Sequence, residues 1–268
     1  MDQGGVFVIL FKMVRYHQKK YPSYIPLHLE EVAGHFDVRR VFPTLPYSLH
    51  TEYSYGKRTF QSELIQKYPE IVRANQDGIP QLWKNEVWAE SFAAFLMELT
   101  KNMPAPSVIE IHPPFHDYVG SMREFIEIYQ VFETQIKSRW QETDILIENR
   151  CGSRYRGGRF LISTAPQIKE LCAWIESEHL KLRIAFDIPQ LYTAHQVTPK
   201  RSYEICALLE ELKEIRQYIG GVHIWGKRTS HSRRISHCGD LNTYFNNDMQ
   251  LKAAFLDSLG RLFSDNQV

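Results

Sequence analysis

The chain has 268 residues, of which 43% are hydrophobic and 24% are charged, so it is long enough for one large globular domain with a sizeable core. Its formal net charge of +1 excludes a uniformly basic surface, so any attraction to phosphate must come from local clusters of cations. Four cysteines without a CxxC pair, the lack of a signal-peptide pattern, and the lack of an apolar run of about 20 residues predict a soluble, disulfide-free cytoplasmic protein without membrane contact.

The first part of the chain predicts one helix and two strands. Apolar residues at helical spacing favour a helix over Val6–Tyr21, although Val6–Phe11 alone could be a strand. We expect buried strands at Tyr24–Glu30 and Pro46–Glu52.

A regular alternation follows an insertion at about residues 55–86. The insertion contains a predicted helix, Phe60–Val72, and is followed by a helix with apolar residues on one face between Trp88 and Leu99. Strands are then expected at Ser107–Pro113, Asp144–Asn149, Lys181–Asp187 and Gly221–Trp225, and helices at Met122–Trp140, Ala165–Glu178, Ser202–Arg216 and Met249–Phe263. Thr164 and Gln167 have the spacing of a capping box.

These elements predict an α/β fold, a (β/α) TIM-type barrel in a single domain over residues 1–268, because helices separate strands that lack polar alternation. The first and eighth strands are not evident, and they would be neighbours in a closed barrel. Their absence would leave one contiguous gap in the barrel with two unpaired strand edges, and proteins usually cover such edges. We therefore expect a partner chain or homodimer there, local pairing by residues 1–11 or Ser264–Val268, or a truncated gene product.

Residue types that bind metals recur where the predicted strands end. In a parallel barrel these ends meet on the face that carries the active site. They hold His50, His112, Glu148, Asp187 and His223. Imidazole and carboxylate suit zinc, manganese or iron, so we predict a metal site; the alternative is a set of polar side chains hydrogen-bonded near the surface.

Three charged residues share the inward parity of these strand ends, namely Glu110, Asp144 and Arg183. Charges inside a barrel must be paired, so Arg183 is expected to neutralise at least one of the two acids. Alternatively, these residues lie at the solvated bottom rim.

Cations follow two of the strands. The segment Ile145–Arg159 passes through Glu148 into a loop that carries Arg150, Arg154, Arg156 and Arg159 and no acid. A second acid-free segment holds Lys227, Arg228, Arg233 and Arg234. Two positively charged loops beside a metal site predict an anionic ligand. The simpler alternative is that these cations only form a solvated surface. Tyr53 adds an aromatic surface beside His50 that suits a nucleotide or a sugar.

Five short motifs in order resemble the endonuclease IV family of the xylose-isomerase-like TIM barrels. They are HTEY (His50–Tyr53), IHPPFH (Ile111–His116), ILIENRCG (Ile145–Gly152), RIAFDIPQLYTAH (Arg183–His195) and GVHIWGKR (Gly221–Arg228). The resemblance implies a nuclease that cleaves DNA at abasic sites with zinc ions, in which Glu148 bridges two metals. Distant relatives isomerise or epimerise sugars with one ion.

The chain departs from that family at its third metal site. Gln190 stands where the family has a histidine, and His237 remains of an Asp-x-His motif, with His231 and Asp240 as replacement ligands. The family's strand-eight glutamate has no counterpart. The resemblance therefore implies one or two ions, with zinc favoured and manganese as the alternative.

The leading hypothesis is a metal-dependent phosphodiesterase of DNA, with Glu148 as the catalytic residue. A sugar or sugar-phosphate isomerase or epimerase is the alternative, and a catalytically weakened nucleic-acid-binding barrel is the third. The predicted substrate contacts are Tyr53, Arg150, Arg154, Arg156, Arg159, Gln190, Lys227 and Arg228.

Overall fold

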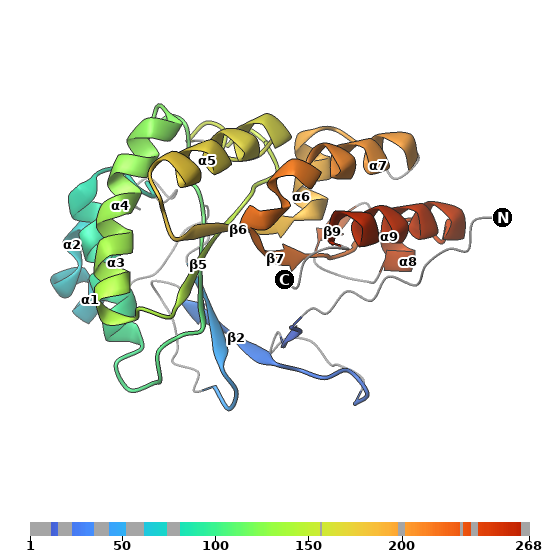
Figure 1. The fold of residues 1–268 in the computed structure, drawn as a ribbon. Helices are drawn as coiled ribbons and strands as arrows, with labels where there is room; N and C mark the ends of the chain where they lie inside the picture. The colour runs from blue at the N-terminus through green and yellow to red at the C-terminus, as the bar shows by residue number, and fades with distance from the viewer. Residues whose placement is uncertain are drawn as a thin grey trace.

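Seven strands form one parallel sheet in the order of the sequence. The computed structural model describes residues 12–15, 23–34, 43–51, 62–73, 81–155, 157–197, 202–230, 233–236 and 241–263. The strands are β1 (Val14–Arg15), β2 (Leu29–Gly34), β3 (Tyr47–Thr51), β4 (Val108–Ile111), β5 (Asp144–Glu148), β6 (Leu182–Asp187) and β7 (Ile219–His223). The sheet curls into a half-barrel with helices between the strands (Figure 1), and no pairing of β1 with β7 closes it within the described residues. The predicted incomplete TIM-type α/β barrel is confirmed.

Helices connect most of the strands. They are α1 (Ser62–Lys67), α2 (Pro69–Arg73), α3 (Glu86–Leu99), α4 (Met122–Arg139), α5 (Ala165–Ser177), α6 (Ile188–Ala194), α7 (Ser202–Glu211), the 3-10 helix η1 (Lys213–Tyr218), α8 (Leu241–Tyr244) and α9 (Met249–Phe263). A separate antiparallel hairpin consists of β8 (Lys227–Ser230) and β9 (Arg233–Ser236).

Side-chain caps begin the helices that cover the central strands. The Asn85 side chain accepts a hydrogen bond from the Trp88 N–H at the start of α3, and Ser121 does the same for Glu124 in α4. At α5 the predicted capping box is confirmed, with Gln167 Oε1 accepting from the Thr164 N–H at 3.0 Å.

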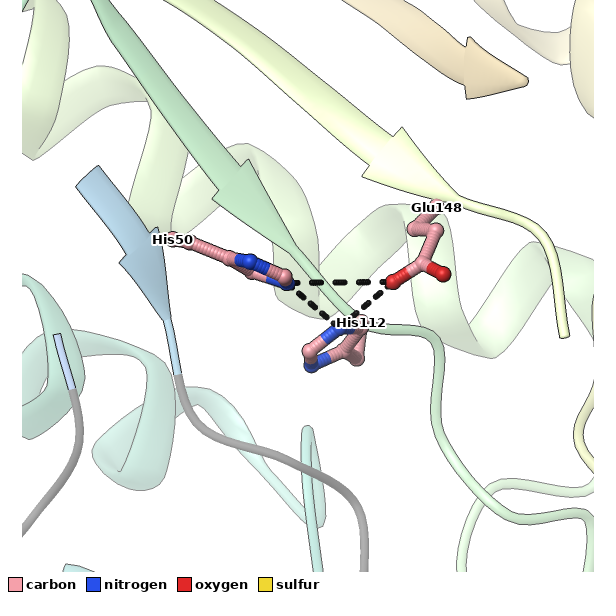
Figure 2. Close-up of side chains that lie close together, drawn as sticks. All are labelled: His50, His112 and Glu148. Carbon is pink, nitrogen blue, oxygen red and sulfur yellow. Dashed lines mark hydrogen bonds and ion pairs between the residues drawn. The ribbon is translucent and has the colours of Figure 1, made fainter. Parts of the chain in front are cut away.

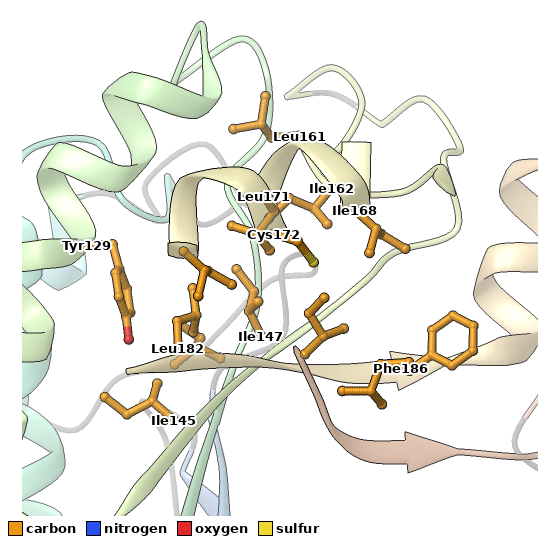
Figure 3. Packing of buried hydrophobic residues seen from close by; sticks show 14 of the residues in the cluster. Tyr129, Ile145, Ile147, Leu161, Ile162, Ile168, Leu171, Cys172, Leu182 and Phe186 are labelled. Carbon is orange, nitrogen blue, oxygen red and sulfur yellow. The ribbon is translucent and has the colours of Figure 1, made fainter. Parts of the chain in front are cut away.

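The core lies between the sheet and these helices. Ile147 and Leu182 of the sheet, with Leu171 and Cys172 of α5, belong to one buried cluster (Figure 3). Burial on both faces explains why the central strands are nearly continuous apolar runs. This packing fixes the carboxyl ends of the central strands, where His50, His112 and Glu148 lie.

The structure corrects the predicted elements near the N-terminus. Val14–Arg15 is a strand inside the helix expected over Val6–Tyr21, so the first strand exists although it is short; most of the remaining range lies outside the described residues. β2 begins at Leu29, and Tyr24 is 82% exposed, so the strand predicted at Tyr24–Glu30 starts too early. Glu30 and Glu31 interrupt the apolar pattern that predicts a buried strand. Both are nevertheless buried, because Glu30 contacts Thr44 and Glu31 contacts His50.

Other predictions differ in detail. The helix expected over Phe60–Val72 is two helices, because Pro69 lacks an N–H and begins α2 instead of continuing α1. Asp144 is exposed, as the solvated-rim alternative has it. Arg183 donates to the Ile219 carbonyl at 2.7 Å and forms no ion pair with an acid of the described chain, so its expected pairing with Glu110 or Asp144 is not observed.

Candidate metal centre

Three strands bring two histidines and a glutamate together. Strand register places Ile111 of β4 opposite Ile147 of β5, so the next residues, His112 and Glu148, lie side by side. His112 Nε2 is 2.8 Å from Glu148 Oε2, and His50 Nε2 of β3 is 3.3 Å from His112 Nε2 (Figure 2). All three side chains are buried, and their ligand atoms lie within 4.8 Å of one another.

A second group shares Glu148. It consists of Glu110 in β4, Glu148 and His223 at the end of β7, and its ligand atoms also lie within 4.8 Å of one another. His223 Nε2 is 3.1 Å from Glu110 Oε2, and His223 Nδ1 is 3.9 Å from Glu148 Oε1. Glu148 is therefore common to both groups, as expected of a shared ligand.

Glu31 of β2 lies against the other ring nitrogen of His50. Its Oε1 is 3.6 Å from His50 Nδ1, and Glu110 Oε1 is 3.4 Å from His50 Nε2. Burial alone would lower the pKa of His50, but Glu110, Glu31 and Glu148 outweigh it and raise that pKa. The pKa of His223 rises to about 10, because Glu110, Glu148 and Asp187 similarly outweigh burial.

Several donors hold Glu148. Its Oε2 accepts from Arg150 Nη1 at 2.9 Å in addition to its contact with His112, and its Oε1 accepts from Gln190 Nε2 at 2.6 Å. Burial would raise the pKa of Glu148, but Arg150, His112 and His223 lower it well below its usual range. Glu148 is therefore a preorganised carboxylate.

Asp187 has a structural partner at each oxygen. It ends β6 and begins α6, where its Oδ1 accepts from the Gln190 backbone N–H at 2.8 Å. Its Oδ2 accepts from Trp225 Nε1 at 2.7 Å and from Gln190 Nε2 at 3.2 Å. Burial and the nearby Glu148 raise the pKa of Asp187 to about 7. Asp187, which ends a predicted strand, and Gln190, to which the resemblance pointed, thus both lie beside Glu148, while the metal-ligand role expected of Asp187 stays a prediction.

The arginine loop after β5 divides into inward and outward residues. Arg150 is 7% exposed and lies over the Phe160 ring, with its guanidinium carbon 5.3 Å from the ring centre, while Arg154 and Arg159 are exposed. The loop packs against the loop after β4, where the Arg159 carbonyl accepts from the His116 N–H at 2.8 Å. Gly158 has a φ of 91°, and a Cβ there would lie 2.5 Å from Asp117 Oδ1, so this glycine serves loop packing.

Some predicted site residues lie outside the described residues, namely Tyr53, Arg156, His231, His237 and Asp240. Lys227 and Arg228 are described only as backbone of the β8–β9 hairpin, an element that sequence reasoning missed. Their roles stay predictions.

The sequence did not reveal the parts that two carboxylates play at the site, Glu110 as a candidate ligand and Glu31 as a partner of His50. Glu110 was recognised only as inward-facing, although its position two residues before His112 places both on one side of β4. Glu31 was missed because the predicted strand stopped at Glu30. Parity placed Glu110 on the inward side, but parity cannot show which acids lie near a histidine.

The donor chemistry fits a divalent metal ion. Buried imidazole nitrogens and carboxylate oxygens from separate strands are ligands that suit zinc, manganese or iron. Glu31 and Arg150 contact ligand residues from outside, as supporting residues around metal sites do. The fold and site together define an incomplete TIM-type barrel with a His/Glu cluster that could hold a metal ion.

No protein-family model matches the chain, and no curated protein matches it. Among solved structures, the crystal structure of AsfvAP:AG is 14% identical, with a TM-score of 0.49 over 80% of this chain and 75% of that chain. A xylose isomerase domain protein from Planctomyces limnophilus is 12% identical, with a TM-score of 0.41 over 88% and 87% of the two chains. Likeness at this level carries no conclusion about the site, and the resemblance to endonuclease IV stays a prediction.

Within the described residues, no helix has both the length and the apolar character needed to cross a membrane.

Proposed function

We propose that this protein is a divalent-metal-dependent phosphodiesterase acting on nucleic acid, with DNA that contains an abasic site as the first substrate to test. The observation that carries the proposal is the buried convergence of His50, His112 and Glu148 from three successive strands. The exposed Arg154 and Arg159 follow Glu148 on the next loop and offer charge to an anionic ligand. The sequence resemblance adds the substrate class.

In this proposal some residues of the site bind the metal ion and others bind the substrate. His50, His112 and Glu148 would hold the ion, which supplies Lewis-acid polarisation of a phosphoryl oxygen when bound. Arg150 keeps Glu148 ionised and in place. Arg154 and Arg159 would contact phosphates that flank the reacting one.

The test compares two histidine variants in full-length protein purified without chelator. His112→Asn removes a ligand, whereas His179→Asn changes an exposed histidine with a φ of 54°, a backbone conformation that asparagine tolerates. Metal content and cleavage of a duplex with one abasic site are measured for each. We expect His112→Asn to lose bound metal and at least 100-fold in cleavage rate, and His179→Asn to match the wild type.

Other outcomes separate the remaining functions. Cleavage that persists undiminished in excess chelator would refute the proposal. Metal-dependent turnover of aldoses or ketoses without DNA cleavage would favour the isomerase, whose substrate needs no phosphate contact. DNA binding without metal or turnover would favour the binding protein.

A further inference from the structure

We propose that Glu110, and not Asp187, supplies the carboxylate that completes a second divalent-cation site with Glu148 and His223. The inference deepens the proposed function and rests on it for the identity of the first ion site. The three ligand residues come from β4, β5 and β7, and their ligand atoms lie within 4.8 Å of one another. Glu110 of β4 comes two residues before His112, which follows that strand, so both side chains are on the same side of the chain, and Glu110 Oε1 lies 3.4 Å from His50 Nε2 of the first group.

Glu110 has the surroundings of a ligand. Its side chain is 5% exposed, and its Oε1 accepts no hydrogen bond from the described residues. The basic groups that contact it there are the imidazoles of His50 and His223, at 3.4 and 3.1 Å; no arginine or lysine of the described chain forms an ion pair with it. A buried carboxylate with an oxygen that accepts no hydrogen bond, and with imidazoles as its basic partners, is placed to bind a cation that those imidazoles would also ligate.

Asp187 has the surroundings of a positioning residue. Backbone and side-chain N–H groups of Gln190 and the Trp225 indole donate to its two oxygens. These contacts cap α6 and hold Gln190, whose amide then donates to Glu148 Oε1. Asp187 Oδ2 also lies 3.9 Å from His223 Nδ1, but the Gln190 and Trp225 donors already occupy this carboxylate, so Asp187 acts on the site through Gln190 and Glu148.

Glu148 can serve both ions because its oxygens face different neighbours. Oε2 lies beside His112 and Oε1 lies toward His223. Each carboxylate oxygen has two lone pairs, so Oε1 can keep the Gln190 amide and still bind an ion. The geometry thus supports a pair of cations that share one carboxylate, with His50 and His112 on one side and Glu110 and His223 on the other.

Manganese stoichiometry tests this assignment. The full chain, stripped and reloaded with Mn²⁺, is measured by elemental analysis and by electron paramagnetic resonance. We expect two equivalents and a magnetically coupled pair in the wild type, and one equivalent with an isolated-ion spectrum in Glu110→Gln. Asp187→Asn, which keeps a good helix cap, should retain two equivalents. Glu127→Gln changes an exposed acid of α4 and is the matched control.

His223→Gln guards against misfolding of Glu110→Gln, because it should lose the same ion by a different substitution. One equivalent or none in the wild type, or two equivalents retained in Glu110→Gln or His223→Gln, would overturn the proposal. So would loss of an ion in Asp187→Asn. Two bound ions without phosphodiester cleavage would leave this site standing and refute the proposed function; cleavage with one ion would do the reverse.

Discussion

Glu31 faces the ring nitrogen of His50 that points away from Glu148 and Glu110. The Nδ1–Oε1 distance is 3.6 Å, and both side chains are buried. A carboxylate on one imidazole nitrogen orients the ring and presents the other nitrogen to a metal. Glu31→Gln should therefore weaken metal affinity by about 10- to 100-fold while the stoichiometry is unchanged. Calorimetric titration with Zn²⁺ measures this, with Glu127→Gln as the control; wild-type affinity in Glu31→Gln would contradict it.

Arg154 and Arg159 differ from Arg150 in their exposure, so we expect them to act in substrate binding. Replacing either with glutamine should lower DNA affinity across sequences and reduce the slope of log affinity against log salt by about 1. Fluorescence anisotropy at several salt concentrations provides the slope. Arg139→Gln, an exposed arginine at the end of α4, should leave it unchanged. An unchanged slope in both loop variants would show that the loop does not bind phosphate.

An aromatic cluster between α3 and α4 packs beside the candidate metal centre. Trp83 is 1% exposed, packs against Phe92 and Phe132, and donates its indole N–H to the His112 carbonyl at 2.7 Å. Trp88 is equally buried, but its indole nitrogen has no hydrogen-bond partner within the described chain. The two tryptophans thus form a natural comparison.

Phenylalanine at either position removes similar volume, so their difference isolates the hydrogen bond. Trp83→Phe should lower the free energy of unfolding by about 1–3 kcal/mol more than Trp88→Phe, because it leaves a buried carbonyl without its donor. Urea denaturation measures both. Equal losses would mean that the indole contact with His112 contributes nothing to stability.

Helices were predicted well where a long apolar periodicity and a cap residue lie in the same segment. α3, α4 and α5 lie close to their predicted ranges, because apolar periodicity and caps at Asn85, Ser121 and Thr164 act within one segment. The seven-residue α6 was missed, since its start depends on the Asp187 cap and its short length shows no periodicity. The hairpin β8–β9 was missed because its charged residues resemble a loop.

At the scale of the molecule, the candidate ligands join strands from β3 to β7, so metal binding should stabilise the whole sheet. At a concentration about 100 times the dissociation constant, a ligand bound only by the folded state adds about 2.7 kcal/mol. For a chain of this size that corresponds to a rise in Tm of roughly 5–10 °C. Differential scanning calorimetry with Mn²⁺ and then with chelator tests it. A Tm unaffected by metal would contradict a site built across the sheet.

The expectation that a partner chain covers the open side of the barrel stays a prediction. Within the described residues, β1 and β7 are the outer strands of the sheet, and β1 is only Val14–Arg15.

The barrel class and the strand ends that carry His50, His112 and Glu148 could be read from the sequence, because strand–helix alternation and residue parity are local properties that do not depend on distant contacts. Which acid lies beside which histidine became clear from the three-dimensional arrangement alone. Glu110 approaches His223 from a strand 113 residues away, and Arg150 turns inward to Glu148 although Arg154 and Arg159 of the same loop are exposed. Such pairings depend on strand register and on the curl of the sheet, which bring distant residues within bonding distance and leave no periodic trace in the chain.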